Sequence, residues 1–397
     1  MAEVSTQAIA IDLDQTDNRQ VRLFRGREGL RSLEADWHRL EKSLMGARFI
    51  HFYGWYKSYL ENSEPNPDSV IFILVSDAGT PVALFPLRRT SLRRFGVPLR
   101  SWVIFWPNDM GICDVIFDKT VANRSMLLLL VATLRGHKDL AWDLLRLQDT
   151  LADSCVQYSL KLVPAPLSLT HLHHYSKYIR CDTDYETVMS RVSKNFSRNV
   201  RRQAKKIYEL GSIEYRFVSK AEELDEAFNH FLQAEATSWK GDDGTGSAII
   251  LYEEKVNFYR TLMREFSKLD ACAINLILLN GRCISSQFCL AMGDTLYLLK
   301  IGYSEEYHAK GPGNVLLNEV LRRCCADEKI QVVSFITGTS WHDNWSPEFL
   351  EVYDSCLFNY TLPGVIVYFL ETIKNYGRRL KHWAQRWKES GKKQRVV

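Results

Sequence analysis

"KIGYSEEYHAKGPGNVLL", residues 300–317, joins an apolar segment to an amphipathic one through a Gly-Pro-Gly turn. Residues 296–301 are apolar enough to form a buried strand. After the turn, apolar side chains recur at helical spacing, at Val315, Leu316, Val320 and Leu321. The stretch therefore predicts a strand, a tight turn and a helix over 312–326.

The turn itself has two interpretations. Gly311 and Gly313 allow backbone geometries that other residues resist, and they let a ligand approach the main chain closely. The N–H groups of a first helical turn favour an anion such as phosphate, and since Pro312 has no N–H, Gly313, Asn314 and Val315 would have to supply them. The alternative is plain architecture, in which a glycine stops the loop and a proline opens the helix.

The same order of elements is expected twice along the chain. In the second half we expect a strand at 213–219, helices at 221–239 and 252–268, three strands within 271–303 that include an Asn280-Gly281 hairpin turn, a helix at 312–326 and a strand at 331–337. In the first half we expect helices at 26–44 and 52–61, a hairpin over 69–89, strands at 102–106 and 112–117, a helix at 121–134 and a strand at 142–148. Residues 149–182, with Pro164, Pro166 and an HLHH tract, are expected to connect the halves.

This order predicts an α/β fold, an α+β type with mixed sheets, built from two similar units. The alternative is one large mixed sheet without duplication. We expect an N-terminal domain at 20–170, a C-terminal domain at 171–361 and a basic amphipathic helix or tail at 362–397. A chain of 397 residues is long enough for two or three domains.

Composition indicates a globular protein of a reducing compartment. The chain is 46% hydrophobic and 25% charged, and no apolar run reaches the length that spans a bilayer. No basic segment followed by an apolar run opens the sequence, so no signal peptide is expected. The nine cysteines form no paired framework. We therefore expect a cytoplasmic protein.

Two basic segments stand out against a near-neutral remainder. Residues 371–397 hold nine Lys/Arg and two Glu, a net charge of +7, so the other 370 residues carry −3. The tail is apolar first and then basic with interleaved aromatics, which suits either the inner face of an anionic membrane or packing across the body. Residues 191–206 carry seven basic residues and no acid. This helix suits an anionic or nucleotide-linked substrate, or is simply a solvated face. No recognised nucleic-acid-binding motif surrounds it, and no DNA partner is expected.

Three motifs together resemble those of one acyltransferase group. Lys300, Tyr303, Tyr307, Pro312, Gly313 and Leu316 match the pattern K-x2-Y-x3-Y-x4-P-G-x2-L. The block from Glu235 through Ser238, Trp239, Lys240 and Gly241 to Gly244 is similar to E-x-x-S-W-K-G-x-x-G, and the block Phe335, Gly338, Trp341, His342 and Trp345 is similar to F-x-x-G-x-x-Y-K-x-x-W. The set is similar to acetyltransferases of cellulose and polysaccharide biosynthesis in the GNAT superfamily, which are related to the Fem aminoacyltransferases.

The resemblance, strongest over 185–350, implies tandem GNAT units and acetyl-CoA as co-substrate. The pyrophosphate of acetyl-CoA would lie on the turn before the helix, at Lys310, Gly311, Pro312, Gly313 and Asn314. The superfamily's usual first phosphate-loop residue would fall at His308, which is neither Gln nor Arg. A departure at His342, where the family has lysine, concerns the acceptor contacts.

Acyl transfer to an amine needs a group that takes the proton of the nucleophile. The candidate catalytic residues are Glu235, Tyr303 and His342, with Asp343 also considered and Glu235 preferred as the base. Candidate substrate-binding residues are Trp239, Lys240, Lys300, Trp341 and Trp345. The alternatives are a helix-surface charge for Glu235, neutralisation of Glu235 by either lysine, and core packing for the tryptophans.

No metal is expected, because His171, His173 and His174 have no acid or cysteine at ligand spacing in what we expect to be a loop. The function predicted is transfer of an acetyl group to an amino group, on a sugar or sugar-nucleotide of a surface polysaccharide. Two rivals remain: a Fem-like enzyme that uses aminoacyl-tRNA, and a non-catalytic scaffold for a membrane synthase. The acceptor and the oligomeric state are not predicted.

Overall fold

The structure, a computed structural model, describes residues 8–9, 19–105, 111–117, 125–162 and 167–393. Its first half contains β1 (Ala8–Ile9), β2 (Arg19–Arg25), α1 (Gly26–Ser32), α2 (Glu34–Glu41), α3 (Tyr53–Asn62), β3 (Val70–Asp77), β4 (Thr80–Arg94), β5 (Val97–Ile104), β6 (Ile116–Phe117), α4 (Ser125–Gly136), β7 (Leu144–Leu151), α5 (Cys155–Leu162) and β8 (Ser168–Arg180).

The second half contains α6 (Tyr185–Ser190), α7 (Lys194–Tyr208), β9 (Ile213–Val218), α8 (Ala221–Ala236), α9 (Glu253–Ser267), β10 (Cys272–Leu279), β11 (Arg282–Met292), β12 (Thr295–Tyr303), α10 (Pro312–Ala326), β13 (Val332–Ser334), β14 (Glu348–Phe358) and α11 (Leu362–Lys393). From β9 to β14 it repeats the order of β2 to β8, a strand, helices, three strands, a helix and two strands, without counterparts of β6 and α5. Short 3-10 helices, η5 (Glu305–Lys310) and η6 (Ser340–Trp345), lead into α10 and β14.

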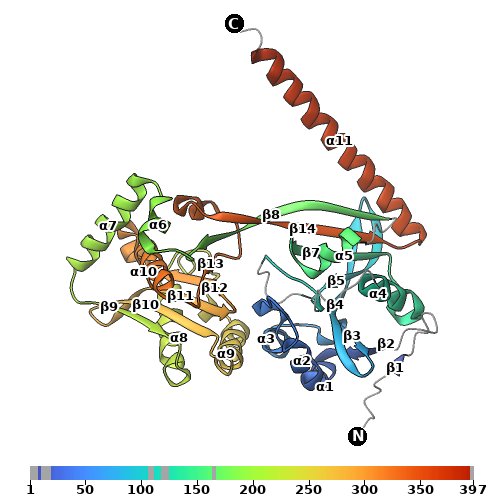
Figure 1. The fold of residues 1–397 in the computed structure, drawn as a ribbon, viewed down its shortest axis with the longest axis horizontal. Coiled ribbons are helices and arrows are strands. Elements are labelled where there is room, and N and C mark those ends of the chain that lie inside the picture. The colour runs from blue at the N-terminus through green and yellow to red at the C-terminus, as the bar shows by residue number, and fades with distance from the viewer. Residues whose placement is uncertain (1–7, 10–18, 106–110, 118–124, 163–166, 394–397) are drawn as a thin grey trace.

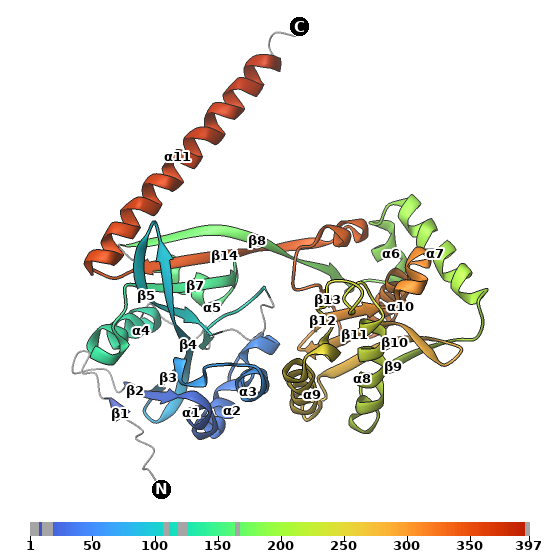
Figure 2. The same ribbon diagram turned by 180° about the vertical axis from the view of Figure 1, so that it is seen from behind.

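All these strands belong to one mixed sheet with the order β1-β2-β3-β4-β5-β7-β14-β8-β13-β12-β11-β10-β9, while β6 pairs with β4. The order is nearly symmetric about the centre, because each half ends in a strand that pairs with the other half. Strand β8 pairs with β13, and β14 pairs with β7, both antiparallel. Figures 1 and 2 show β8 and β14 running side by side between two lobes. The α/β fold is confirmed: the two halves have similar element orders, and their strands belong to one large mixed sheet.

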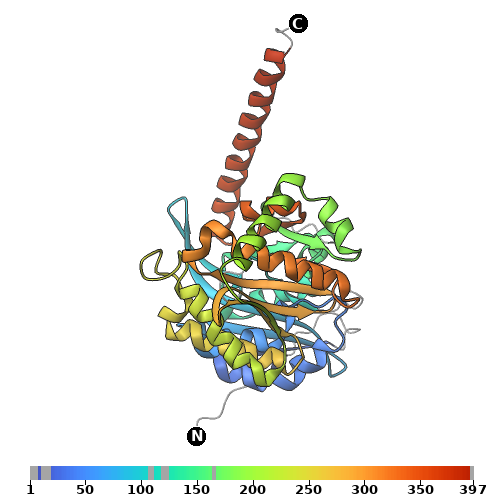
Figure 3. The same ribbon diagram turned by 90° about the vertical axis from the view of Figure 1, so that its left-hand side faces the viewer.

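The two lobes also share a core. Helix α3 of the first half packs against α9 of the second, where Trp55 and Phe258 lie with ring centroids 5.7 Å apart. The Lys57 ammonium donates to the Glu265 carboxylate at 2.9 Å across the same contact. Phe49 contacts Tyr297 of β12, with ring centroids 5.0 Å apart. Helix α11 leaves the body beside β5 and β14 and projects from it (Figure 3).

Local signals in the sequence located most elements. Both predicted hairpin turns occur, with left-handed backbone at Ala78 and Gly79 and again at Asn280 and Gly281, as a two-residue turn between twisted strands requires. Helix α10 has the predicted bounds. The predicted residues Trp106 and 121–124 lie outside the described residues. All nine cysteines are free, as expected.

Two expectations about the first half were wrong. The expected strand at 112–117 is only β6, with Cys113 in an isolated bridge. The expected connection at 149–182 contains α5 and the 13-residue β8. Much of β8 is exposed on both of its faces, so its sequence lacks the apolar alternation that marks a strand with one buried face. The HLHH tract therefore lies in a strand and not in a loop.

Candidate active site

A cavity of about 450 Å³ lies where β12 ends and α10 begins. All three motifs of the sequence contribute to its wall. The Glu235–Gly244 motif gives Ser238, Trp239 and Lys240, and the Phe335–Trp345 motif gives Trp341. The Lys300–Leu316 motif gives Ile301, Gly302, Tyr303, His308, Gly311, Pro312, Gly313 and Asn314. Segments separated by up to about a hundred residues thus meet at one site, which the sequence could only suggest.

The cavity lies where β12 continues past the end of its neighbour β13 while it stays paired with β11. Strand β12 pairs with β13 only over Thr295–Tyr297, because β13 ends at Ser334. The register between β11 and β12 shifts by one residue at Leu299, a bulge that bends the strand. Beyond the bulge, no described strand pairs with β12 on the β13 side, and Ile301, Gly302 and Tyr303 line the cavity.

The Gly-Pro-Gly turn lies at the cavity as the sequence predicts, but it offers fewer free donors. Gly311 adopts left-handed backbone with φ of 56° and precedes the first turn of α10. The N–H groups of Asn314 and Val315 both donate to the Gly311 carbonyl, at 3.0 and 3.2 Å. The expected three-donor cradle is therefore not formed, because two of its donors close the turn instead. In the described part of the chain, only the Gly313 N–H of these three has no such bond.

Helix α7 lies against this turn. A Cβ atom on Gly311 would lie 2.3 Å from Nε2 of Gln203, so the end of this side chain lies directly against the turn. Gln203 lines the cavity, and its buried Oε1 has no hydrogen-bond partner within the described residues. This acceptor is therefore available to a ligand or water in the cavity. The basic character of 191–206 is thus carried by a helix that borders the cavity.

Tyr303 is the predicted catalytic residue that lies in the cavity wall. Its hydroxyl lies 3.2 Å from Nδ1 of His308, which also lines the cavity. Burial raises the pKa of Tyr303, with a smaller contribution from Glu305, so the phenol is protonated at neutral pH. Tyr303 can therefore act as a proton donor.

Glu235, the predicted base, is placed differently. It is 2% exposed and does not line the cavity. One carboxylate oxygen accepts from Nζ of Lys240 at 3.0 Å and the other accepts from the N–H of Ile249 at 2.9 Å. Lys240 also donates to the Ile301 carbonyl of β12 at 2.8 Å. The buried pair therefore ties α8 and its following loop to β12, which agrees with the alternative that Lys240 neutralises Glu235.

The aromatic candidates divide into two groups. Trp239 is 50% exposed and Trp341 is 37% exposed, and both line the cavity. Trp345 is 1% exposed and packs edge-on against Phe196 with centroids 5.1 Å apart, which makes it part of the core. A sugar platform is therefore open to the first two only.

His342 is buried behind Trp341. It stacks on Phe335 at 4.1 Å and contacts Trp341 edge-on at 4.1 Å. Burial lowers the pKa of His342 to about 4, aided by Lys177, so the imidazole is neutral. This placement suits a residue that positions Trp341 better than one that touches the substrate.

The remaining predicted residues, Lys300 and Lys310, are half-buried and do not line the cavity. The cavity is also lined by residues that the sequence did not single out: Gln203, Ser285, Ser286, Gln287 and Leu317. The three β11 residues among them form a buried polar run within a mostly apolar strand. The described residues that could hold a metal, Asp149, His173 and His174, are not among the residues that line the cavity.

Comparison with known proteins agrees with this geometry. The profile of the acetyltransferase (GNAT) domain family matches residues 194–345, which contain α7 through η6 and all three motifs. This part of the chain therefore has the GNAT acyltransferase fold. No curated protein matches the sequence.

Solved structures share the fold over most of the chain. The match to the crystal structure of FemX covers 85% of this chain and 98% of the FemX chain at 10% identity, with a TM-score of 0.52. L-PGS from Bacillus licheniformis covers 87% and 96% at 12% identity, with a TM-score of 0.53. The C-terminal domain of a putative lysylphosphatidylglycerol synthetase from Agrobacterium fabrum covers 83% and 94% at 8% identity, with a TM-score of 0.52. At these identities the likeness shows the fold alone.

Within the described residues, we find no helix that is long and apolar enough to cross a membrane.

Proposed function

We propose that this chain is an acyltransferase that moves an acetyl group from acetyl-CoA to an amino group of a sugar or sugar-nucleotide. The observation that carries the proposal is the single cavity to which all three motifs contribute. Its wall combines an open strand edge, the start of a helix, a protonated tyrosine and two exposed tryptophans. These are the features that an activated acyl donor and a polar acceptor require.

The donor fits along the open edge of β12. The amides of an extended acyl-carrying arm can pair with the groups of this edge other than the Ile301 carbonyl, which accepts from Lys240, as peptides do when they add to a sheet edge. Its phosphates would lie towards Gly313, Gln203 and the basic side of α7. The first helical turn and neighbouring cations favour such a group.

The chemistry needs few groups. The acceptor amine attacks the thioester carbon, the carbon–sulfur bond breaks, and the thiolate leaves. In the proposed step the Tyr303 hydroxyl gives its proton to the departing thiolate, and the amine loses a proton to water. Solvent reprotonates the phenolate through exposed His308. A backbone N–H near the end of β12 would polarise the acyl carbonyl.

Binding of acetyl-CoA by calorimetry tests the donor site. Gly313→Asp should weaken binding by about tenfold or more, because a carboxylate at the first turn of α10 repels phosphate while favouring the helix. A Cβ atom at this position meets only Tyr303, at 3.7 Å, so the fold should persist. Ala221→Asp adds the same charge to the first turn of α8 and should leave binding unchanged.

Turnover tests the catalytic assignment. Tyr303→Phe should lower acetyl transfer to amino sugars by about 10²-fold or more, the scale of lost acid catalysis. Tyr376→Phe, on exposed α11, is the control. A chain that binds no form of CoA would overturn the proposal, and a chain that binds acetyl-CoA but transfers nothing to any amino sugar would leave the scaffold alternative.

A second candidate is aminoacyl transfer from aminoacyl-tRNA, as in Fem-like enzymes. It is favoured by one feature, the basic helix α7, which carries exposed Arg198, Arg201, Arg202, Lys205 and Lys206 and borders the cavity through Gln203. An ultrafiltration assay that compares acetyl-CoA with charged tRNA separates the two. Retention of charged tRNA alone, weakened by reversing two α7 charges, would favour this candidate.

A further inference from the structure

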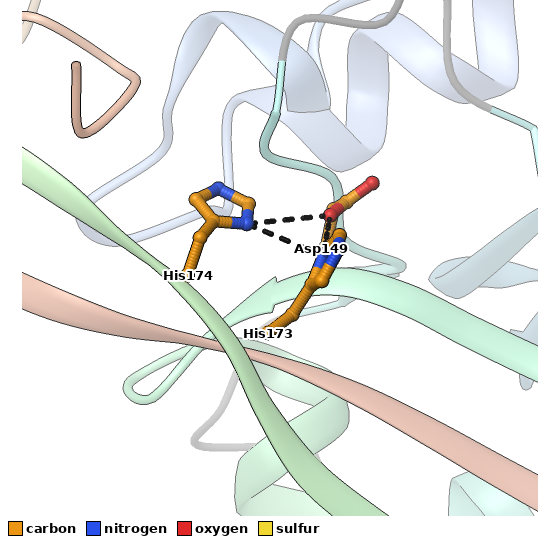
Figure 4. Close-up of side chains that lie close together, drawn as sticks. All are labelled: Asp149, His173 and His174. Atoms are coloured by element: carbon orange, nitrogen blue, oxygen red, sulfur yellow. Dashed lines mark hydrogen bonds and ion pairs between the residues drawn. The ribbon is translucent and has the colours of Figure 1, made fainter.

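Three ligand-type side chains meet where β7 and β8 flank β14. Figure 4 shows Asp149 of β7 facing His173 and His174 of β8. Nδ1 of His173 lies 2.8 Å from Oδ1 of Asp149 and 3.2 Å from Nδ1 of His174. Nδ1 of His174 lies 3.8 Å from the same oxygen. The two histidines and the acid thus direct three potential ligand atoms at one point.

Two irregularities of the sheet create this convergence. Consecutive strand residues normally point to opposite faces, so adjacent histidines should not share a partner. In β8, His173 is an extra residue between the paired positions Leu172 and His174. In β7, Gln148 and Asp149 together oppose the single residue Asp354. Such bulges turn side chains out of their regular alternation.

Asp149 adopts left-handed backbone at its bulge, with φ of 51°. This conformation is uncommon for a residue with a Cβ atom, although aspartate tolerates it better than most. The Asp149 N–H donates to Oδ1 of Asp354 at 3.0 Å, which helps to hold the bulge. Residues kept in such conformations concentrate at functional sites.

The tautomer of His174 is fixed by a contact on its far side. Nε2 of His174 lies 2.9 Å from the Gly111 carbonyl, which can only accept, so Nε2 carries the proton. In the neutral imidazole, Nδ1 then presents a lone pair to His173 and Asp149. A histidine that donates one N–H to a backbone carbonyl and offers its other nitrogen is the usual arrangement of a metal ligand.

We propose that Asp149, His173 and His174 bind one divalent transition-metal ion, with zinc as the best fit. Nitrogen and oxygen ligands about 2.0–2.1 Å from a tetrahedral zinc lie about 3.3 Å from one another. The three separations here, 2.8, 3.2 and 3.8 Å, bracket this value. Small side-chain rotations would therefore complete three corners of the tetrahedron.

Water would take the fourth corner. His173 is exposed, so the site is open to solvent on this side. Both oxygens of Asp354 are already engaged: Oδ1, 3.8 Å from Nδ1 of His173, accepts from the Asp149 N–H, and the other oxygen accepts from Arg146. It therefore supports the Asp149 backbone and completes no corner. The ion would join β7 of the first half to β8 across β14, at the strands that the two halves exchange.

The alternative is a hydrogen-bonded cluster without a metal, in which His173 donates to Asp149. Measured zinc content separates the two. The untagged full chain, stripped with chelator, incubated with zinc sulfate and desalted, should retain about one zinc ion per chain. Loss of a residue that only contacts a metal ligand typically lowers metal affinity by roughly 10–100-fold. Asp149→Asn and His174→Gln remove a ligand itself, so each should weaken zinc binding by at least this factor.

A matched control removes a different histidine–acid contact. Nδ1 of exposed His38 lies 2.7 Å from Oε2 of Glu41 on α2, and His38→Gln should leave the zinc content unchanged. Zinc should also raise the Tm of the wild-type chain and of this control, but not that of Asp149→Asn. Circular dichroism shows that each variant is folded.

Titration of the wild-type chain with Co²⁺ keeps the proposal testable if a variant fails to fold. Visible absorption bands of tetrahedral Co²⁺ should appear and saturate at one equivalent. Their absence, or equal zinc retention by wild type and folded Asp149→Asn, would overturn the proposal and leave the hydrogen-bonded cluster as the explanation.

Discussion

Glu235 and Tyr303 show how the same motif set yields residues with different tasks. Both belong to motifs of the resembled family, and both were candidates for proton transfer. The tertiary structure directs the carboxylate of Glu235 to Lys240 and Ile249 in the interior, whereas Tyr303 lines the cavity. A motif fixes which residue type stands at a position, and only packing fixes the direction in which it points.

Glu235→Gln should destabilise the fold. The substitution leaves the Lys240 ammonium, with a side chain only 16% exposed, without its counter-charge, and a loss of about 1–3 kcal/mol in unfolding free energy is expected. Denaturant unfolding measures this change. The control Glu226→Gln, an exposed acid on the same helix, should stay within about 0.5 kcal/mol of wild type. If stability were unchanged while transfer was lost, Glu235 would instead be the catalytic base.

His342 should make stability depend on pH. Burial lowers its pKa from 6.5 to about 4, so the unfolded chain binds a proton more readily than the folded chain between these values. The contribution of His342 is therefore complete above about pH 6.5 and is lost as the pH falls towards 4. Denaturant unfolding at several pH values between 7.5 and 5 gives the unfolding free energy as a function of pH. This free energy should fall less steeply with falling pH for His342→Asn than for wild type. An equal slope in both would contradict the burial of a neutral imidazole.

At the scale of elements, close helix packing joins the two halves. Gly54 on α3 faces α9, and a Cβ atom there would lie 2.8 Å from Cβ of Glu265. Gly54→Ala should therefore separate the helices and cost about 1–3 kcal/mol. Gly136→Ala on α4 meets no atom within 4 Å and should instead stabilise the chain, by about 0.5–1 kcal/mol. The Tm and the unfolding free energy should fall for Gly54→Ala and rise for Gly136→Ala. A change of the same sign in both variants would refute the close contact of Gly54 with α9.

At the scale of the whole molecule, α11 presents an exposed apolar stripe. Its exposed apolar residues recur at spacings of four and three: Leu362, Ile366, Phe369, Ile373 and Tyr376. On another side Val367 is buried, and Glu371 accepts from Arg94 at 2.6 Å, which anchors the helix to the body. Residues 371–397 also carry a net charge of +7. Because exposed apolar residues and positive charge together favour an anionic membrane surface, we propose that this helix lies on one.

Flotation with anionic vesicles tests this role of α11. The full chain should bind, whereas a chain ending at Thr361 and the full-length variant Ile373→Asp should not. Met45→Asp, at an apolar residue that is 81% exposed elsewhere, should bind like wild type. Binding should weaken with salt and on neutral vesicles, because the attraction is in part electrostatic. Equal, negligible binding by all chains would exclude the membrane role.

Local sequence determined the hairpins, the bounds of α10, the repeated order of elements and the family resemblance. These depend on backbone preferences and periodicities that span a few residues, as at Asn280-Gly281. Only the tertiary structure decided the exchange of β8 and β14, the inward direction of Glu235 and the approach of Asp149 to His173. Each of these depends on strand register or on a contact between distant segments. Because a shift of one residue in register reverses the face of every side chain, spacing along the chain cannot specify them.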